Sequence, residues 1–207
     1  MKEKRITLRT NIQKIRKIIN KQIPDTKLVA QALKDADSFA SIIDRYEDKL
    51  FRYILRILSV STEDAQDILQ EVFIKVYENL NDYDSTYKFS SWIYRITYNH
   101  SISYYRKRKN HLQTLSLEDS EEIVRKLKSQ LDINKETDDQ LQKELIQKIL
   151  KGLDKKYRDP LILHYLEDKS YEEISNILKK PSGTVGTLIN RAKKKFKEEY
   201  KTLTATS

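Results

Sequence analysis

The chain has 207 residues, of which 38% are hydrophobic and 34% are charged, and its formal net charge is +9. It contains no cysteine, which excludes disulfide bonds, thiolate chemistry and cysteine-ligated zinc and fits a reducing cytoplasm. Its three histidines lack metal-ligand spacing, no apolar run reaches the roughly 18 residues of a membrane span, and no nucleophile–base pair or phosphate loop is present. We therefore expect a cytoplasmic protein without a metal, a cofactor, a membrane span or an enzymatic activity.

The positive charge is concentrated towards the two ends of the chain. Residues 1–27 carry nine bases and two acids, whereas residues 28–110 carry twelve of each. Residues 111–151 carry seven bases and nine acids, and residues 152–207 carry twelve bases and eight acids. Two basic zones around a mildly acidic connector favour a polyanionic partner that is contacted at more than one place. The alternative is a lysine-rich protein without such a partner.

Helical periodicity dominates the first part of the chain. Apolar residues recur at spacings of three and four, and no glycine or proline lies between Pro24 and Gly152, so we predict an all-α protein. A basic amphipathic helix is expected at residues 6–19. A longer helical pattern runs over residues 28–58, with an interruption and cap at Asp37 and Ser38.

A strong amphipathic pattern follows Ser61, whose side chain we expect to cap the helix. A polar loop at residues 81–86 leads to KFSSWIYRITYNHSISYYRKRKN, residues 88–110, a helix expected to be capped by Ser90 or Ser91. This stretch holds six aromatic and six basic residues. Aromatic rings stack on unpaired bases while cations hold phosphates, so the composition predicts contact with single-stranded or melting DNA. The alternative is that one face is ordinary core and the basic end is solvated.

Residues 111–140 are polar and are expected to form a linker. Beyond them we expect a helix from Leu141 to Leu153, a helix with Pro160 in its first turn, and a capping box at Ser170 and Glu173. A glycine-containing break at residues 180–183 separates this third helix from a basic last helix, which is the pattern of a helix-turn-helix that places its second helix in the major groove.

The last helix offers two kinds of side chain to duplex DNA. Short polar groups face bases and cations suit phosphates. The candidates for bases are Ser182, Thr184, Thr187 and Asn190, and those for phosphates are Arg191, Lys194 and Lys195. The alternative is a plain helical hairpin with a solvated lysine face.

Three segments in this order resemble bacterial sigma factors of the minimal, two-domain extracytoplasmic-function class. They are EDAQDILQEVFIKVYENLNDY, the aromatic-basic stretch given above, and LDKKYRDPLILHYLEDKSYEEISNILKKPSGTVGTLINRAKKKF. The resemblance implies two small helical domains joined by a polar linker. Sigma domain 2 would span residues 28–110, the linker 111–140 and sigma domain 4 residues 141–200, with a basic extension at 1–27 and a tail at 201–207.

The resemblance also implies a function without catalysis by this chain. Such a protein binds core RNA polymerase, directs it to promoters by recognising their minus-10 and minus-35 elements, and assists strand opening. Its expected partners are core RNA polymerase, promoter DNA as duplex and as melted non-template strand, and an anti-sigma factor. The rivals are a helix-turn-helix regulator that acts without polymerase, and a sigma-like decoy or adaptor that binds polymerase without melting promoters.

The resemblance also implies roles for the individual residues of this chain that match the family's motifs. The polymerase clamp helices would be bound by Asp67, Gln70 and Glu71. The minus-10 element would be bound by Tyr83, Lys88, Phe89, Trp92, Arg95 and Asn99, with Tyr83 and its loop capturing a flipped base and Asn99 reading bases. The helix-turn-helix would read the minus-35 element. Gly186 and Leu188 depart from the pattern because arginine is usual at both positions, and a bidentate arginine–guanine contact contributes about 1–3 kcal/mol of discrimination.

Overall fold

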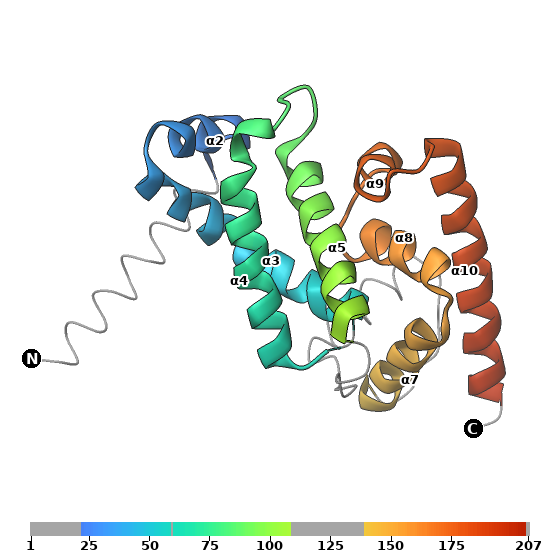
Figure 1. Ribbon diagram of the computed structural model, residues 1–207. Coiled ribbons are helices and arrows are strands. Elements are labelled where there is room, and N and C mark those ends of the chain that lie inside the picture. The colour runs from blue at the N-terminus through green and yellow to red at the C-terminus, as the bar shows by residue number, and fades with distance from the viewer. Residues whose placement is uncertain (1–21, 59, 109–138, 206–207) are drawn as a thin grey trace, which may run out of the picture.

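The computed structural model describes residues 22–58, 60–108 and 139–205 (Figure 1). Within these residues all regular structure is helical, as predicted. The elements are α2 (Asp25–Lys34), η1 (Ala36–Phe39), α3 (Ala40–Leu58), α4 (Thr62–Glu78), η2 (Leu80–Asp82), α5 (Phe89–Arg108), α7 (Asp139–Gly152), α8 (Lys155–Tyr165), α9 (Tyr171–Leu178) and α10 (Ser182–Ala205). The predicted helix at residues 6–19 and most of the expected linker lie outside the described residues.

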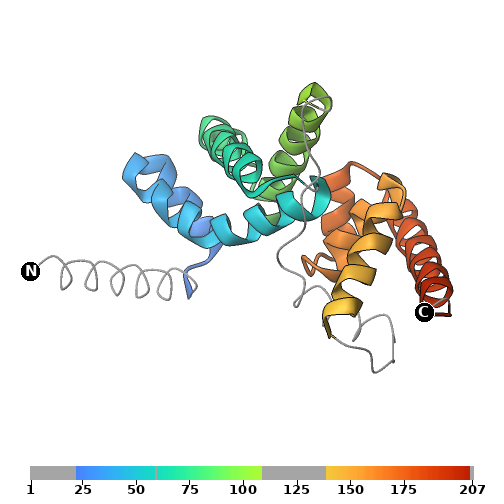
Figure 2. The ribbon, with the colours of Figure 1, turned by 90° about the horizontal axis from the view of Figure 1, so that it is seen from below.

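Helices α2 to α5 form the first of two helical bundles. α3 packs against α4 and α5, and α2 with η1 covers one end of this unit (Figures 1 and 2). Its core is made of apolar side chains at helical spacing, among them Ile42, Leu50, Ile54, Ile68, Val72 and Ile93. The unit begins before Leu28, because the Asp25 carboxylate pairs with Arg45 and accepts a hydrogen bond of 2.6 Å from the Tyr46 hydroxyl.

The helix caps of this bundle were predicted with mixed success. Ser61 caps α4, as expected, by accepting a 3.0 Å hydrogen bond from the Asp64 backbone N–H. The interruption between α2 and α3 spans residues 35–39 and includes Asp37 and Ser38, as predicted. The cap, however, is Asp35, whose carboxylate accepts hydrogen bonds from the Asp37 N–H and the Ser38 hydroxyl. A capping side chain binds backbone N–H groups two or three residues ahead, so Asp35 and Asp37 were both candidates. The prediction chose the second of these two acids, and the structure uses the first.

The predicted cap of α5 is wrong. α5 begins at Phe89, and the Lys88 carbonyl accepts the first hydrogen bonds from the N–H groups of Ser91 and Trp92, at 2.9 and 3.2 Å. Ser90 and Ser91 therefore lie within the first turn. The Ser90 hydroxyl is 3.4 Å from the Glu173 carboxylate, 83 residues further along the chain.

Helices α7 to α10 form the second bundle. Its buried side chains include Ile146, Ile149, Leu161, Ile174, Val185, Ile189 and Phe196. The capping box of α9 is present as predicted: the Ser170 hydroxyl accepts from the Glu173 N–H at 3.2 Å, and the Glu173 carboxylate accepts from the Ser170 N–H at 3.0 Å. Pro160 lies in the middle of α8 and not in its first turn, because the helix already begins at Lys155.

The two bundles pack against each other. α5 lies beside α9 and α3 touches α8, while α10 occupies the outer side of the second bundle (Figures 1 and 2). None of the helices in the described ranges combines the length and the apolarity that crossing a bilayer requires.

Candidate nucleic-acid interface

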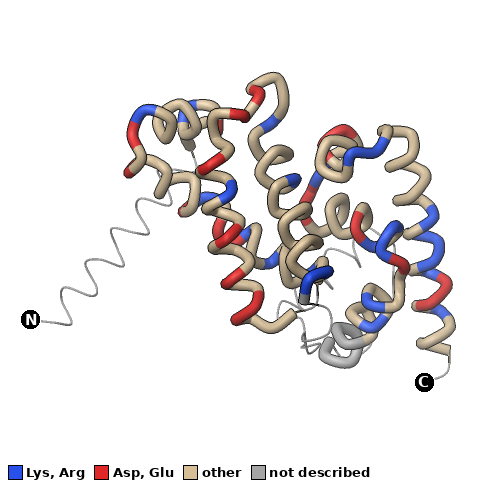
Figure 3. Tube along the Cα trace, in the orientation of Figure 1, with Lys and Arg blue, Asp and Glu red and all other residues tan. Residues whose placement is uncertain are grey.

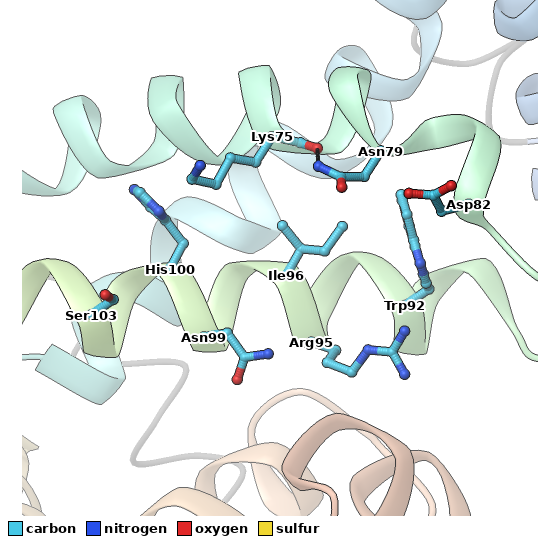
Figure 4. A pocket seen from close by; sticks show the side chains of 9 residues that line it. All are labelled: Lys75, Asn79, Asp82, Trp92, Arg95, Ile96, Asn99, His100 and Ser103. Atoms are coloured by element: carbon cyan, nitrogen blue, oxygen red, sulfur yellow. Dashed lines mark hydrogen bonds between the residues drawn. The ribbon is translucent and has the colours of Figure 1, made fainter.

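A pocket of about 470 Å³ lies between α4 and α5 (Figure 4). This volume falls in the range of pockets that hold small organic ligands. The pocket is lined by Lys75, Asn79, Asp82, Trp92, Arg95, Ile96, Asn99, His100 and Ser103. Three of the predicted DNA-binding residues, Trp92, Arg95 and Asn99, are thus brought together in one site.

The other lining residues were missed from the sequence, although part of the signal was present. The α5 residues of the pocket recur at spacings of three and four, which places them on one helical face. Lys75 and Asn79 come from α4, and the Asn79 amide donates a 2.7 Å hydrogen bond to the Lys75 carbonyl. Only the packing of α4 on α5 places these two residues at the pocket.

The side chains at the pocket point in different directions. Arg95 and Asn99 project from the side of α5 that faces away from α4, whereas Ile96 and His100 project towards α4 (Figure 4). Asn99 is exposed and Arg95 is partly exposed. A neutral amide and a guanidinium at one rim offer hydrogen bonds to a base edge and charge to a phosphate.

His100 links this pocket to the outer face of α4. Its Nε2 lies 2.9 Å from a carboxylate oxygen of Glu71, and its side chain is 11% exposed. Burial lowers the pKa of His100 below its ordinary value, and the Glu71 carboxylate offsets part of this effect. Glu71 is thus close to the pocket as well as on the surface for which it was predicted.

An aromatic cluster lies beneath the loop between η2 and α5. The ring centroid of Tyr83 is 5.2 Å from that of Phe89 and 5.5 Å from that of Trp92. Phe89 and Trp92 are 2% and 6% exposed. Phe89 is therefore part of the core and cannot stack on a base in this conformation, contrary to the sequence-based expectation of a direct DNA contact. Trp92 is also core, although it lines the pocket.

Tyr83 and Lys88 remain accessible at the same end of α5. Tyr83 is half-buried, and its hydroxyl donates a 2.6 Å hydrogen bond to the Tyr87 carbonyl. The loop is ordered further by the Asp84 carboxylate, which accepts from the Thr86 N–H at 2.9 Å. Lys88 is exposed, at the start of α5.

The outer face of α4 carries the three residues predicted to bind polymerase. Asp67, Gln70 and Glu71 are all exposed on one side of the helix. The exposed apolar side chains of Ile74, at 57%, and Tyr77, at 48%, follow them along the helix. A polar surface that continues into exposed apolar residues is typical of protein–protein contacts.

The helix-turn-helix consists of α9 and α10, but its turn differs from the predicted one. Lys179 adopts a left-handed conformation with φ of 52°, Pro181 follows, and α10 already begins at Ser182. Gly183 is therefore helical, and a lysine instead of a glycine supplies the positive φ of the turn.

The exposed side of α10 carries every residue predicted to contact duplex DNA. Ser182, Thr184, Thr187, Asn190, Arg191, Lys194 and Lys195 are all exposed, and basic residues recur along this helix (Figure 3). The opposite side is anchored by Val185, Ile189, Ala192 and Phe196. The Thr187 hydroxyl donates a 3.0 Å hydrogen bond to the Gly183 carbonyl, so its methyl group and its oxygen lone pairs are what it presents outward.

Gly186 has a packing role in this arrangement. A Cβ atom at Gly186 would lie 3.4 Å from Cε2 of Tyr171, the first residue of α9. The ring of Tyr171, which is 38% exposed, thus lies against α10 at the position where a side chain on residue 186 would project.

Together, the pocket and the helix-turn-helix define a helical protein with two separate candidate surfaces for nucleic acid. Among the described residues no three His, Asp or Glu side chains gather as metal ligands would. Comparison with known protein families gives the class. Residues 42–111 match Sigma-70 region 2, and residues 143–196 match Sigma-70, region 4.

Known proteins narrow this class further. The chain is 36% identical over 187 residues to the ECF RNA polymerase sigma factor SigW of Bacillus subtilis. The alignment covers 86% of this chain and 97% of that protein. It is 28% identical over 190 residues to the ECF RNA polymerase sigma-E factor of Haemophilus influenzae, covering 88% of this chain and 98% of that one. The chain therefore belongs to the sigma-70 family and, within it, to the extracytoplasmic-function sigma factors.

Solved structures support the fold. CnrH, in complex with the cytosolic domain of CnrY, aligns with a TM-score of 0.64 at 22% identity and covers 88% of this chain and 99% of that one. The sigma factor RpoE of Bartonella quintana, in complex with the anti-sigma factor NepR, aligns with a TM-score of 0.58 at 19% identity and covers 79% and 96%.

Proposed function

We propose that this chain binds core RNA polymerase and directs it to a subset of promoters, acting in the cytoplasm without catalysis of its own. The observation that carries this proposal is the pocket between α4 and α5, with Arg95 and Asn99 at its rim, in a chain of the sigma-70 family. In this proposal the first bundle is the polymerase- and minus-10-binding unit, and the second bundle is the minus-35-binding unit. Residues 111–140 connect them, and residues 1–27 add a basic extension.

The proposed contribution to strand opening is the capture of unpaired bases. Taking a base out of the stack costs a few kcal/mol, and a pocket that holds the base offsets this cost. Tyr83 supplies an accessible ring, Asn99 hydrogen bonds to a base edge, and Lys88 and Arg95 supply charge for the phosphates. Phe89 and Trp92 support this surface from the core, because Tyr83 packs on both of their rings.

Two further contacts complete the proposal. The exposed face of Asp67, Gln70 and Glu71 docks on polymerase, and Ile74 extends it with apolar area. The exposed side of α10 reads the duplex minus-35 element. Several weak contacts to polymerase and DNA add through effective concentration, so no single one has to be tight. We further propose an anti-sigma factor as a regulatory partner.

The test of docking is a double variant, Asp67→Ala with Gln70→Ala. We expect weaker binding to core polymerase, measured by competition with a labelled parent chain. Glu47→Ala, an exposed acid on α3, is the control for the loss of charge. An affinity of the double variant equal to that of the control would remove this face from the proposal.

The test of base reading is Asn99→Ala, with Ser103→Ala one turn further along the same pocket as the control. We expect Asn99→Ala to flatten the preference among minus-10 variants in transcription while polymerase affinity stays unchanged. If the parent chain itself transcribes all minus-10 variants equally, Asn99 has no reading role.

The decisive experiment is run-off transcription with purified core RNA polymerase on a library of random promoters, with and without this protein. New start sites that require the protein establish the proposed function and give both promoter elements. Stable polymerase binding without new starts would instead establish a decoy or adaptor. Duplex DNA binding without polymerase binding would establish a helix-turn-helix regulator.

A further inference from the structure

A partly exposed aromatic ring lies at the edge of the side of α10 that we assign to duplex DNA. Tyr171 is the first residue of α9, which packs beside α10 (Figure 1). A Cβ atom at Gly186 would lie 3.4 Å from Cε2 and 3.6 Å from Cδ2 of this ring. The ring therefore packs on the backbone of α10, at a position where the helix carries no side chain.

Gly186 lies between two residues that we propose to face bases. Ser182 and Asn190 are each four positions away from it, so the three residues lie on one side of the helix. Both Ser182 and Asn190 are exposed. The ring of Tyr171, which is 38% exposed, thus borders the proposed DNA-binding surface.

The position of this ring is fixed by its own bundle. The ring centroid of Tyr171 is 5.1 Å from that of His164 in α8, in an edge-on arrangement. His164 is held in turn by its Nδ1, which lies 2.9 Å from the Lys169 carbonyl oxygen. The capping box of Ser170 and Glu173 fixes the backbone at the start of α9. A side chain that is already ordered loses little conformational entropy when it binds a ligand.

The hydroxyl of Tyr171 is available to bind a ligand. It forms no hydrogen bond within the part of the chain that the structure describes. A phenol is neutral at pH 7 and donates one O–H, and tyrosine is among the side chains that bind phosphate oxygens in protein–DNA complexes. The first helix of a helix-turn-helix crosses the DNA backbone, and Tyr171 begins this helix. A backbone phosphate is therefore the acceptor that fits this hydroxyl.

We propose that Tyr171 is a DNA-binding residue whose hydroxyl donates a hydrogen bond to one backbone phosphate of the duplex beside α10. The proposal rests on the proposed function, because it concerns the duplex that α10 is proposed to read. Gly186 permits the contact, since an arginine at this position would displace the ring of Tyr171. This edge of the surface thus holds the DNA backbone through a neutral group and reads no base.

The contact is measured by fluorescence anisotropy of the assembled polymerase complex on a labelled promoter duplex at several salt concentrations. Tyr171→Phe removes only the hydroxyl, and we expect it to bind about tenfold more weakly than the parent. The phenol is neutral, so the dependence of affinity on salt should keep its parental slope. Lys194→Ala should instead reduce the steepness of this slope by about 0.9.

Tyr165→Phe is the matched control. It removes the hydroxyl of a ring that also packs against His164, at 4.7 Å between centroids, but that is only 8% exposed. We expect this variant to bind DNA like the parent. Thermal melting of Tyr171→Phe should also match the parent, because the variant keeps the ring and its contacts with Gly186 and His164.

A phosphate scan locates the acceptor. Each phosphate of the minus-35 block is replaced singly by a neutral methylphosphonate, and the loss of affinity is compared between the parent and Tyr171→Phe. We expect one phosphate whose replacement weakens the parent clearly more than the variant. This comparison remains valid if the variant melts at a lower temperature, because it measures a difference between DNA duplexes for each protein.

Three results would overturn the inference. They are parental affinity of Tyr171→Phe, equal losses in both proteins at every phosphate, and a loss in Tyr171→Phe that varies with the base sequence of the minus-35 block. The proposed function is tested separately by scrambling this block. If the parent binds the scrambled duplex as tightly as the promoter, α10 does not read a minus-35 element, whereas the phosphate contact is still decided by the scan.

Discussion

Two substitutions at Tyr83 distinguish its structural role in the loop from its proposed role in stacking on an unpaired base. The ring of Tyr83 packs edge-on against Phe89 and tilted against Trp92, and its hydroxyl donates a 2.6 Å hydrogen bond to the Tyr87 carbonyl. Tyr83→Phe removes the hydrogen bond alone. Tyr83→Ala removes the ring as well, and with it the accessible stacking surface at this end of α5.

The expected magnitudes differ between the two variants. A hydrogen bond contributes about 0.5–1.5 kcal/mol net, and Tyr83→Phe should lie near the low end because the residue is partly exposed. Two aromatic pairs contribute about 0.5–1.5 kcal/mol each, so Tyr83→Ala should destabilise the first bundle by about 1–3 kcal/mol. Loss of one stacked base costs a further ~1–3 kcal/mol of DNA binding, which corresponds to about 5- to 150-fold.

The assay is fluorescence anisotropy of the assembled polymerase complex on a promoter fork with an unpaired minus-10 strand, with thermal melting of the free chain alongside. Tyr83→Phe should bind within about twofold of the parent, and Tyr83→Ala should bind at least fivefold more weakly. Parental binding by Tyr83→Ala would refute base stacking by this ring. An equal loss in both variants would show that the hydroxyl, and not the ring, makes the contact.

Three further variants test the structure in other places. Gly186→Ala should raise the melting temperature by a few degrees, because alanine favours the helix by about 1 kcal/mol relative to glycine. Its Cβ would contact only the partly exposed ring of Tyr171. A lower melting temperature would show that this contact tolerates no side chain. Ser170→Ala should cost about 1 kcal/mol in denaturant unfolding, and no loss would contradict the capping box. Burial lowers the pKa of His100, so the folded chain binds its proton less readily than the unfolded chain, and stability should fall as the pH drops from about 6.5 through the lowered pKa. His100→Gln should flatten this part of the melting-temperature profile, and an identical profile would contradict the sign of the shift.

Local chemistry could be read from the sequence, and contacts between distant segments could not. Ser61 and Ser170 cap their helices as predicted, because each accepts a hydrogen bond from a residue three positions away. Ser90 looked like a cap for the same reason. Its hydroxyl instead lies near Glu173 in the other bundle, and no local pattern reports such a neighbour.

The aromatic content of α5 shows the same limit. Aromatic rings beside basic residues predicted a surface for unpaired bases, but Phe89, Trp92, Tyr94 and Tyr104 are all buried. Composition cannot tell a ring that packs on α3 and α4 from one that faces solvent. The spacing of the pocket residues along α5 was a better guide to the site than the number of aromatic rings. Residues three and four apart lie on the same face of a helix.

Polar and charged side chains take part in the contact between the two bundles. Tyr94 and Tyr98 of α5 donate hydrogen bonds to Glu167 and Asp159, and Arg56 of α3 forms a buried ion pair with Glu167. Replacing a buried ion pair by apolar side chains of similar volume is often neutral or stabilising, so this pair is not the strongest way to join two bundles. Exposure to water would cost more free energy for apolar side chains at the same positions than for hydroxyls. Water replaces the hydrogen bonds that the hydroxyls give up.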